Sequence, residues 1–143
     1  IFILIIILSS CIFCDMINGK RPYYEIYHDS DIIAILDKYP IDKGHSLVIT
    51  KKPYEKLTDM SNQEVAELFS KIPKIANAII KATNADAFSI AQNNGKAARQ
   101  TIPHVHVHII PRYNDTGTLW LKRKILRDNE LDELAQKIRK CME

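Results

Sequence analysis

His104-Val105-His106-Val107-His108-Ile109-Ile110 is the stretch that decides how this chain folds and what it does. Histidine alternates with β-branched residues, which favour a strand over a helix. Side chains two residues apart in a strand point to the same face. The three imidazoles are therefore predicted to share one face, while Val105, Val107 and Ile109 face a core.

This histidine row has three interpretations. The first is a polar, solvent-facing side of an amphipathic strand. The second is a metal site, because two histidines two residues apart on a strand can chelate zinc. The third interpretation is nucleophilic and acid–base chemistry on phosphate. Imidazole has a pKa near ~6.5, and a row can combine one attacking nitrogen with donors for phosphate oxygens. Strict alternation of three of the chain's five histidines favours this third interpretation.

The segment upstream also favours phosphate chemistry. Asn93-Asn94-Gly95 follows a predicted strand, and Arg99-Gln100-Thr101 leads into the histidine row. Such a loop offers backbone N–H groups, an amide and a hydroxyl, all of which can donate to phosphate oxygens. Asn-Asn-Gly by itself is also a simple turn.

The composition is that of one ordinary globular domain. Of the 143 residues, 46% are hydrophobic and 26% are charged, which is average for a folded protein. A chain of this length buries enough surface to fold without a disulfide or a metal. The net charge of +3 is spread along the chain, which suits a small anionic substrate and argues against a nucleic-acid partner.

The N-terminus begins with an unbroken apolar run, Ile1 to Leu8. The run is too short to span a bilayer, which takes about 20 residues, and no positively charged segment precedes it as in a secretory signal. We therefore expect a cytoplasmic protein with no membrane partner; secretory or membrane targeting by residues 1–10 is the alternative. The expected organisation is an extension over 1–10, a domain over 11–113, and a tail with a helix over 114–143 that belongs to the same domain.

Turn-forming residues divide the chain into short runs rich in β-branched and aromatic side chains. Five of these runs are predicted strands: Tyr24–His28, Ile32–Leu36, Ser46–Thr50, Ala87–Gln92 and Val105–Ile110. The first three follow one another closely enough for antiparallel pairing.

Two helices are predicted. Ser61 and Glu64 form an S-x-x-E capping box, and an apolar stripe at helical spacing follows: Val65, Leu68, Phe69, Ile72, Ala76, Ile79 and Ile80. Pro73 lies inside this stripe and predicts a kink rather than two separate helices. A later helix, with Asp128 as its cap, places four apolar side chains on one face: Leu131, Leu134, Ala135 and Ile138. One sheet with helices packed on it is an α+β fold.

These motifs together resemble the histidine triad (HIT) superfamily, and most closely its Hint-type branch of nucleotide phosphoramidate hydrolases. The signature is His, apolar, His, apolar, His, apolar, apolar, which here runs from His104 to Ile110 and is followed by Pro111-Arg112. The resemblance spans about Cys11 to Tyr113, and further segments match in order: Cys11-Ile-Phe-Cys14-Asp-Met-Ile-Asn-Gly19, Ile35-Leu36-Asp37-Lys-Tyr-Pro40, Gly44-His45-Ser-Leu-Val-Ile49 and the 93–101 loop.

The resemblance implies a five-stranded antiparallel sheet with a long kinked helix and a C-terminal helix, the sheet being continued across a homodimer. It implies hydrolysis or transfer at the α-phosphate of a purine nucleotide conjugate, through a nucleotidyl-histidine intermediate. His106 matches the nucleophile, and His104 and His108 match its flanking partners. His45 matches the histidine that supports the triad, although it also fits an ordinary histidine at the start of a strand.

The resemblance also implies nucleotide-binding positions. Asp37 matches the carboxylate that accepts from the ribose hydroxyls, since an ionised carboxylate only accepts; the alternative is a turn residue. Asn93 and Thr101 match phosphate-contacting positions, with Gln100 directly before Thr101. Several apolar residues are candidates both for the wall of a base pocket and for the core: Ile12, Phe13, Ile26, Leu36 and Leu47.

Some relatives bind structural zinc through the two N-terminal cysteines, the first histidine of the triad and a further histidine after the third strand. Pro53 occupies that last position here, so Cys11, Cys14 and His104 would supply three of the four ligands that structural zinc prefers. We therefore expect that no cofactor is required and that the cysteines are small buried residues. A disulfide between them is the alternative for a secreted protein.

Two segments depart from the family pattern. Arg99 occupies a position that is often Gly, which adopts φ > 0 without the strain that Arg incurs. The alternatives are a loop of different shape, or an Arg99 that adds a cation near the phosphate; an Arg99 that faces solvent is favoured. Residues 114–143 do not match the Trp-containing tail of the best-known Hint-type proteins, and Trp120 stands in a different context. The leaving group is consequently the part of the substrate that the sequence determines least.

The leading hypothesis is a purine nucleotide phosphoramidate hydrolase acting on a substrate such as adenosine 5′-monophosphoramidate. A dinucleoside polyphosphate hydrolase of the Fhit-type branch is the alternative enzyme. A nucleotide-binding interaction protein with residual activity is the alternative from another class. DNA-end processing, as in the aprataxin-type branch, is disfavoured because the chain lacks a basic patch and a Cys/His module.

Overall fold

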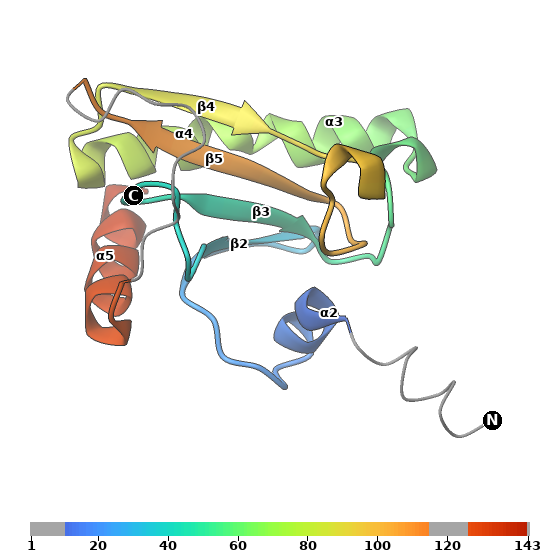
Figure 1. Cartoon of the computed structure of the whole chain (residues 1–143), viewed down its shortest axis with the longest axis horizontal. Helices are drawn as coiled ribbons and strands as arrows, with labels where there is room; N and C mark the ends of the chain where they lie inside the picture. Colours follow the sequence, from blue (N-terminus) through green and yellow to red (C-terminus); the bar gives the residue numbers. More distant parts are fainter. Residues whose placement is uncertain (1–10, 115–125, 143) are drawn as a thin grey trace.

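The computed structural model describes residues 11–114 and 126–142, so the 1–10 extension and Trp120 lie outside the described residues. One five-stranded sheet forms its centre, in the order β1-β2-β3-β5-β4, and every neighbouring pair is antiparallel (Figure 1). The strands are β1 (Glu25–His28), β2 (Ile32–Leu36), β3 (Ser46–Thr50), β4 (Ala87–Ala91) and β5 (His106–Arg112). The predicted α+β class is confirmed.

The strand predictions differ from the structure mainly at β5. The bounds predicted for β2 and β3 are confirmed, while β1 begins one residue later than predicted and β4 ends one residue earlier. The predicted strand Val105–Ile110 is wrong at both ends, because β5 begins at His106 and continues to Arg112. Pro111 is tolerated within β5, although it cannot donate a ladder hydrogen bond.

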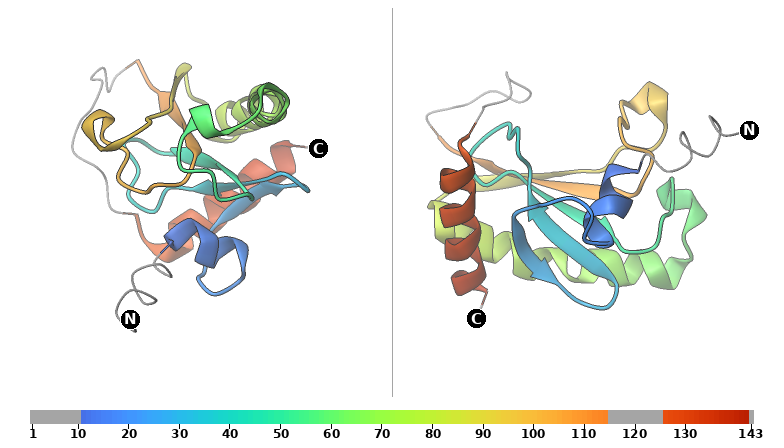
Figure 2. Two further views of the ribbon diagram at one scale, coloured as in Figure 1. Left: turned by 90° about the vertical axis from the view of Figure 1, so that its right-hand side faces the viewer. Right: turned by 90° about the horizontal axis from the view of Figure 1, so that it is seen from below.

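Every residue of β2 and β3 is buried, because packing covers both faces of these central strands. The larger apolar cluster lies between one face of the sheet and helices α3, α4 and α5; the smaller cluster lies between the other face and α2. Figure 2 shows α3 and α4 along one side of the sheet and α2 on the opposite side. Alternate residues of β2 and β3 belong to different clusters, as the period of two requires.

Helices α3 (Asn62–Ser70) and α4 (Ile72–Thr83) form the long bent helix of the fold and meet at Lys71. The predicted capping box is present, since Ser61 Oγ accepts from the Glu64 backbone N–H and a Glu64 carboxylate oxygen accepts from the Ser61 N–H. Pro73 is the second residue of α4. Its ring fits a first helical turn but not a helix interior, which explains why the bend falls two residues before it.

Two further helices complete the described fold. Helix α5 (Asp128–Cys141) buries the predicted face, Leu131, Leu134, Ala135 and Ile138. Its N-cap is Arg127, so the predicted cap at Asp128 is wrong by one residue. Helix α2 (Ile12–Ile17) is short and buries Phe13 against the sheet. No helix in the described part of the chain is long and apolar enough to cross a membrane.

Candidate active site

The register of β5 on β3 places the histidines on the face that α2 covers. His108 lies opposite Leu47 and His106 opposite Ile49, and both of these β3 residues belong to the α2 cluster. Val107 lies opposite Val48 and belongs to the other cluster. The predicted division of the stretch into a histidine face and a core face is therefore correct for the residues within β5.

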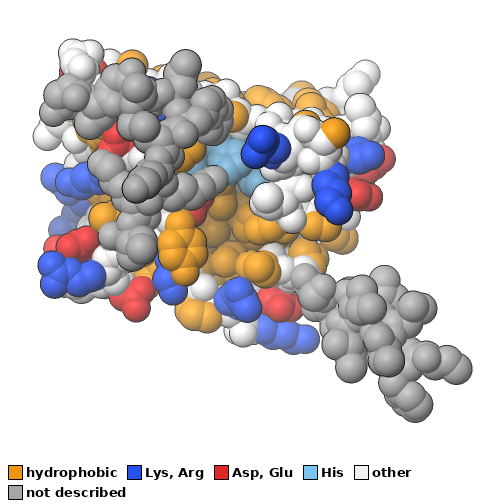
Figure 3. Space-filling view, viewed as in Figure 1, with side chains coloured by type: hydrophobic (Ala, Val, Ile, Leu, Met, Phe, Trp, Pro, Cys, Tyr) orange, Lys and Arg blue, Asp and Glu red, His pale blue; other side chains and the backbone are white. Residues whose placement is uncertain are grey.

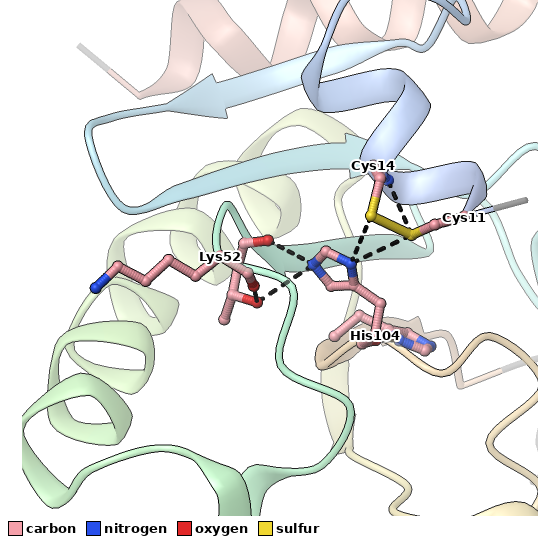
Figure 4. The surroundings of a disulfide bond; sticks show 6 residues. Cys11, Cys14, Lys52 and His104 are labelled. Carbon is pink, nitrogen blue, oxygen red and sulfur yellow. Dashed lines mark hydrogen bonds between the residues drawn. A yellow bond between two sulfur atoms is a disulfide. The ribbon is translucent and has the colours of Figure 1, made fainter. Parts of the chain in front are cut away.

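His104 lies before β5 rather than in it, and its environment differs from that of the other two triad histidines. Its Nε2 lies 2.7 Å from the Thr50 carbonyl oxygen, which can only accept, so Nε2 carries the hydrogen. Nδ1 of the neutral ring is then unprotonated, and it faces the sulfurs of Cys11 and Cys14 at 3.5 and 3.6 Å (Figure 4). Burial lowers the pKa of His104 and keeps this ring neutral.

The backbone carbonyl of His104 fixes the tautomer of His106. His106 Nδ1 lies 2.7 Å from that carbonyl oxygen and must donate to it. The lone pair of neutral His106 is therefore on Nε2. Burial lowers the pKa of His106 below the ordinary value, since only 7% of the residue is exposed. The interpretation of the row as a solvent-facing polar surface is consequently wrong.

His45 and His108 form a chain of hydrogen bonds, a relay in which each group donates to the next, from Ile41 through His45 to His108. The Ile41 N–H donates to His45 Nδ1 at 3.0 Å, so the hydrogen of neutral His45 is on Nε2. That Nε2 lies 2.9 Å from His108 Nδ1 and donates to it. His108 therefore carries its own hydrogen on Nε2, where it is a donor. Asp37 adds a carboxylate oxygen 3.7 Å from His45 Nε2.

Gly44 makes the position of fully buried His45 possible. Its φ of +92° lies in the region that only Gly adopts readily. A Cβ on Gly44 would meet a methyl carbon of Thr83 at 2.8 Å and the ring of Pro111 at 3.1 Å. The turn therefore needs Gly both for its backbone conformation and for the close approach of α4 and β5.

A cavity of about 510 Å³ lies beside the triad and is the candidate nucleotide pocket. Its volume is within the usual range for a small-molecule site. Six of the predicted site residues line it: Ile12, Phe13, Asp37, Thr101, His106 and His108, together with the candidate wall residues Leu36 and Leu47. The Phe13 ring packs edge-on against His106 with the centroids 5.0 Å apart. Ile26 belongs instead to the core on the other face. Figure 3 shows the histidine surface open to solvent beside an apolar area.

The 93–101 loop reaches the pocket through Thr101 but not through Gln100. The side-chain oxygen of Gln100 accepts from the Gly95 N–H, and its nitrogen donates to the Glu55 carbonyl. Gln100 is therefore buried and braces the loop, which is a positioning role. Asn93 is half-buried and is not among the residues that line the pocket. Asn94, which was not among the predicted binding residues, anchors the loop by accepting from the Leu57 N–H.

Arg99 has a left-handed backbone, with φ of +64° and ψ of +33°, and it is exposed. The loop thus keeps the shape that Gly would give it, and Arg incurs the strain. We predict that Arg99→Gly stabilises the fold by about 0.5–1 kcal/mol, because the cost of a left-handed residue exceeds the entropy that Gly loses on folding. Urea denaturation measures the difference.

The matched control for Arg99→Gly is Ala98→Gly, which is in the same 3-10 turn (Lys96–Ala98) and has no positive φ. It should destabilise the protein, because Gly adds only unfolded-state entropy there. Equal effects of the two substitutions would contradict the assignment of strain to Arg99.

Cys11 and Cys14 are joined by a disulfide and are half-exposed, so their prediction as small buried residues is wrong. Both sulfurs and His104 Nδ1 lie within 4.8 Å of one another, which is three donors of the types that zinc prefers. No fourth donor joins them among the described residues, and Pro53 stands at the family's fourth position. The residues described therefore do not complete a four-ligand structural zinc site.

A second group of ligand types is formed by Asp37, His45 and His108. Its two facing imidazole nitrogens are already hydrogen-bonded to each other, so the relay uses the atoms that a metal would need.

Sequence reasoning missed the backbone groups that set the tautomers, namely the Thr50 carbonyl and the Ile41 N–H. It also missed part of the pocket wall: Met16, Arg21, Pro22, Tyr23, Tyr24, Lys38, Tyr39 and Ile102. Local patterns carry no signal for backbone groups brought together from separate strands. Tyr39 had a signal, since it lies within the matched segment from Ile35 to Pro40.

The fold and this site define an α+β protein with a row of histidines beside an open cavity. The family model of the HIT domain matches residues 18–115, and the chain belongs to the histidine triad (HIT) family. The chain is 41% identical over 135 residues to adenylylsulfatase HINT3 of Arabidopsis thaliana, covering 94% of this chain and 68% of that protein. It is 36% identical over 106 residues to adenosine 5′-monophosphoramidase hnt1 of Schizosaccharomyces pombe, covering 74% and 77%.

Among solved structures, a zinc-bound histidine triad family protein from Mycobacterium smegmatis superposes with a TM-score of 0.81. The two chains are 37% identical, and the alignment covers 93% of each. This similarity over nearly the full length agrees with the fold described above.

Proposed function

We propose that this HIT-family nucleotide hydrolase cleaves purine nucleotide phosphoramidates, of the adenosine 5′-monophosphoramidate type, at the α-phosphorus. The observation that carries the proposal is the pair of oppositely oriented rings beside the cavity. His106 offers a lone pair on Nε2 because its Nδ1 donates to the His104 carbonyl. His108 offers an N–H on Nε2 because its Nδ1 accepts from His45. A nucleophile and a hydrogen-bond donor side by side are what phosphoryl transfer needs.

In the first step, His106 Nε2 attacks the α-phosphorus and the P–N bond of the substrate breaks. The leaving nitrogen takes a proton from solvent and departs as ammonia, while His108 Nε2–H donates a hydrogen bond to it. In the second step water attacks the nucleotidyl-histidine, which restores neutral His106, releases the nucleotide and returns one proton to solvent. Asp37 accepts hydrogen bonds from the ribose hydroxyls, while Ile12 and Phe13 contact the base.

The relative with 41% identity favours a second candidate, hydrolysis of adenylyl sulfate. A charge pattern agrees with an anionic leaving group: residues 87–114 contain Lys96, Arg99 and Arg112 and no Asp or Glu. In Figure 3 a Lys or Arg side chain lies directly beside the histidine surface. Both candidates share the same attack by His106 and differ only in the group expelled.

The test is rapid-quench mass spectrometry with adenosine 5′-monophosphoramidate, followed by rate comparison with adenylyl sulfate and diadenosine triphosphate. We expect a nucleotidyl adduct on His106 and the highest kcat/KM on the phosphoramidate. A higher kcat/KM on adenylyl sulfate would establish the second candidate, and on diadenosine triphosphate a dinucleoside polyphosphate hydrolase. AMP binding without hydrolysis of any of the three would mean a nucleotide-binding protein.

The mechanism predicts where activity is lost in acid. His106 attacks only when neutral, and burial holds its pKa below the ordinary value. The acid limb of kcat/KM should therefore have an apparent pKa below ~6.5. A pH–rate profile measures it, and an acid limb centred above pH ~6.5 would contradict a neutral buried nucleophile.

The same shifts predict the pH dependence of stability. The unfolded chain protonates His104 and His106 at their ordinary pKa, whereas the folded protein resists protonation to lower pH. The stability that these neutral rings contribute is present above pH ~6.5 and is lost as the pH falls below it. Denaturant unfolding at a series of pH values tests this sign.

We also propose that two copies of the chain pair through β4, which is an edge strand of the sheet. Phe88 and Ile90 of β4 are 41% and 46% exposed, which is unusual for large apolar side chains. An exposed apolar edge strand favours pairing with another strand. Light scattering should give a dimer for the wild type and a monomer for Ile90→Lys; a monomeric wild type would contradict the proposal.

A further inference from the structure

The sulfurs of Cys11 and Cys14 form a cluster with the ring of His104, and the proposed reaction uses neither the sulfurs nor that ring. Cys11 is the N-cap of α2 and Cys14 lies in its first turn, with their Cα atoms 5.1 Å apart, a separation that a disulfide spans readily. The Cys14 backbone N–H also donates to Cys11 Sγ at 3.1 Å. Both residues are half-exposed, so a small thiol can reach them.

The oxidation state of this pair changes what His104 can bind. Its Nδ1 accepts, since Nε2 donates to the Thr50 carbonyl. In the disulfide neither sulfur carries a hydrogen, so Nδ1 receives none from the pair (Figure 4). In the dithiol an S–H can donate to it, because both sulfurs are within 3.6 Å. Oxidation therefore removes a hydrogen bond to the first triad histidine.

The disulfide also closes a loop that contains part of the pocket wall. Its two intervening residues, Ile12 and Phe13, both line the nucleotide pocket. The Phe13 ring contacts the rings of both His104 and His106, with centroids 5.8 and 5.0 Å apart. The disulfide restricts the motion of this part of the pocket wall before a ligand binds. Less conformational entropy is then lost when the ligand binds.

We propose that Cys11 and Cys14 are a thiol–disulfide exchange site whose oxidation state sets the nucleotide affinity of the adjoining pocket. The reaction partner is a low-molecular-weight thiol of the glutathione class. Two such thiols reduce the protein disulfide to two cysteines and leave as one disulfide, so that two electrons and two protons are transferred. The cysteine pair thus has a redox role in a chain where Pro53 replaces the fourth ligand of the family's zinc site.

The expected coupling is a reduced form that binds AMP about fivefold more weakly than the oxidised form, at the lower end of typical coupling between two sites. Coupling is reciprocal, so saturating AMP should favour the disulfide by the same factor in a glutathione buffer. The choice of AMP as the ligand whose affinity is measured rests on the proposed function, whereas the thiol–disulfide exchange site does not.

The experiment compares oxidised protein with protein reduced by a phosphine, both with a metal chelator present. The Cys141→Ser background removes the free cysteine of α5 from the assay. Intact mass confirms the gain of two hydrogens, and calorimetry gives the dissociation constant for AMP. The matched variant Cys14→Ser cannot form the disulfide, so its affinity should equal that of the reduced form under both conditions.

Equal AMP affinity in the two oxidation states would overturn the proposal, as would the same redox response in Cys14→Ser. Tight stoichiometric zinc binding by the reduced wild type would overturn it in favour of a metal site; Pro53→His, which restores the missing ligand type, is the positive control. If AMP bound in neither state, the proposed function would fail instead. In that case amide hydrogen exchange over residues 12–17 tests whether the oxidation state changes the pocket wall. Equal exchange rates in the oxidised and reduced forms would overturn the proposal.

Discussion

His106→Ala should reduce kcat on adenosine 5′-monophosphoramidate by at least about 10⁴-fold, the loss typical of removing a covalent nucleophile. The reason is that, among the described triad histidines, only His106 both lines the cavity and has a lone pair that no neighbouring group occupies. His108 Nδ1 accepts from His45, and His104 does not line the cavity. AMP binding should change little, since Asp37 and the apolar wall remain. Single-turnover kinetics and calorimetry measure the two effects separately.

The matched control is His28→Ala. His28 lies at the end of β1, its side chain is 60% exposed, and it is outside the pocket. It should retain wild-type kcat. Wild-type turnover in His106→Ala would show that the mechanism does not pass through a nucleotidyl-histidine on this residue.

His45→Asn should reduce kcat by about 10³-fold while leaving the fold nearly as stable as the wild type. The shorter amide can still accept from the Ile41 N–H but cannot reach His108, which lies 2.9 Å beyond His45 Nε2. Without that donor, His108 is no longer held in the tautomer that places a hydrogen on Nε2. Loss of the correct tautomer costs about 10⁴-fold in a serine protease triad, and a partly retained tautomer population makes the expected loss smaller here.

His45→Leu separates the two roles of His45. Leucine leaves the buried Ile41 N–H without an acceptor, so the free energy of unfolding should fall by about 1–3 kcal/mol in addition to the loss of kcat. Urea unfolding of both variants gives the comparison. If His45→Asn kept wild-type kcat, the relay through His45 would not matter for catalysis. If His45→Leu were as stable as His45→Asn, the Ile41 hydrogen bond would contribute nothing.

Much of the fold was predictable because its signals are local. The capping box at Ser61 and Glu64 specifies a helix start within four residues. Short runs rich in β-branched residues specify β2 and β3 to the residue. The histidine alternation within β5 holds for the same reason, since the strand period is two. The β5 boundary failed because it depends on where pairing with β3 and β4 begins, which is a non-local property.

The candidate site divides in the same way. The residue types and their order identify the three histidines, His45 and Asp37 as a group. Which nitrogen of each ring carries the hydrogen follows from backbone groups of Thr50, Ile41 and His104 itself. Gln100 shows the same limit, because its contact with the Glu55 carbonyl crosses 45 residues of chain. Hydrogen bonds between distant segments leave no spacing pattern to detect.

The stretch from His104 to His108 by itself determined that this chain places imidazoles on one face of β5, at His106 and His108, because side-chain alternation is a property of the local backbone. Only the tertiary structure decided that the three rings differ. One faces the Cys11–Cys14 disulfide, one presents a lone pair to the cavity, and one donates a hydrogen through the relay from His45. A neutral imidazole has one donor and one acceptor nitrogen, and the groups that choose between them come from other parts of the fold.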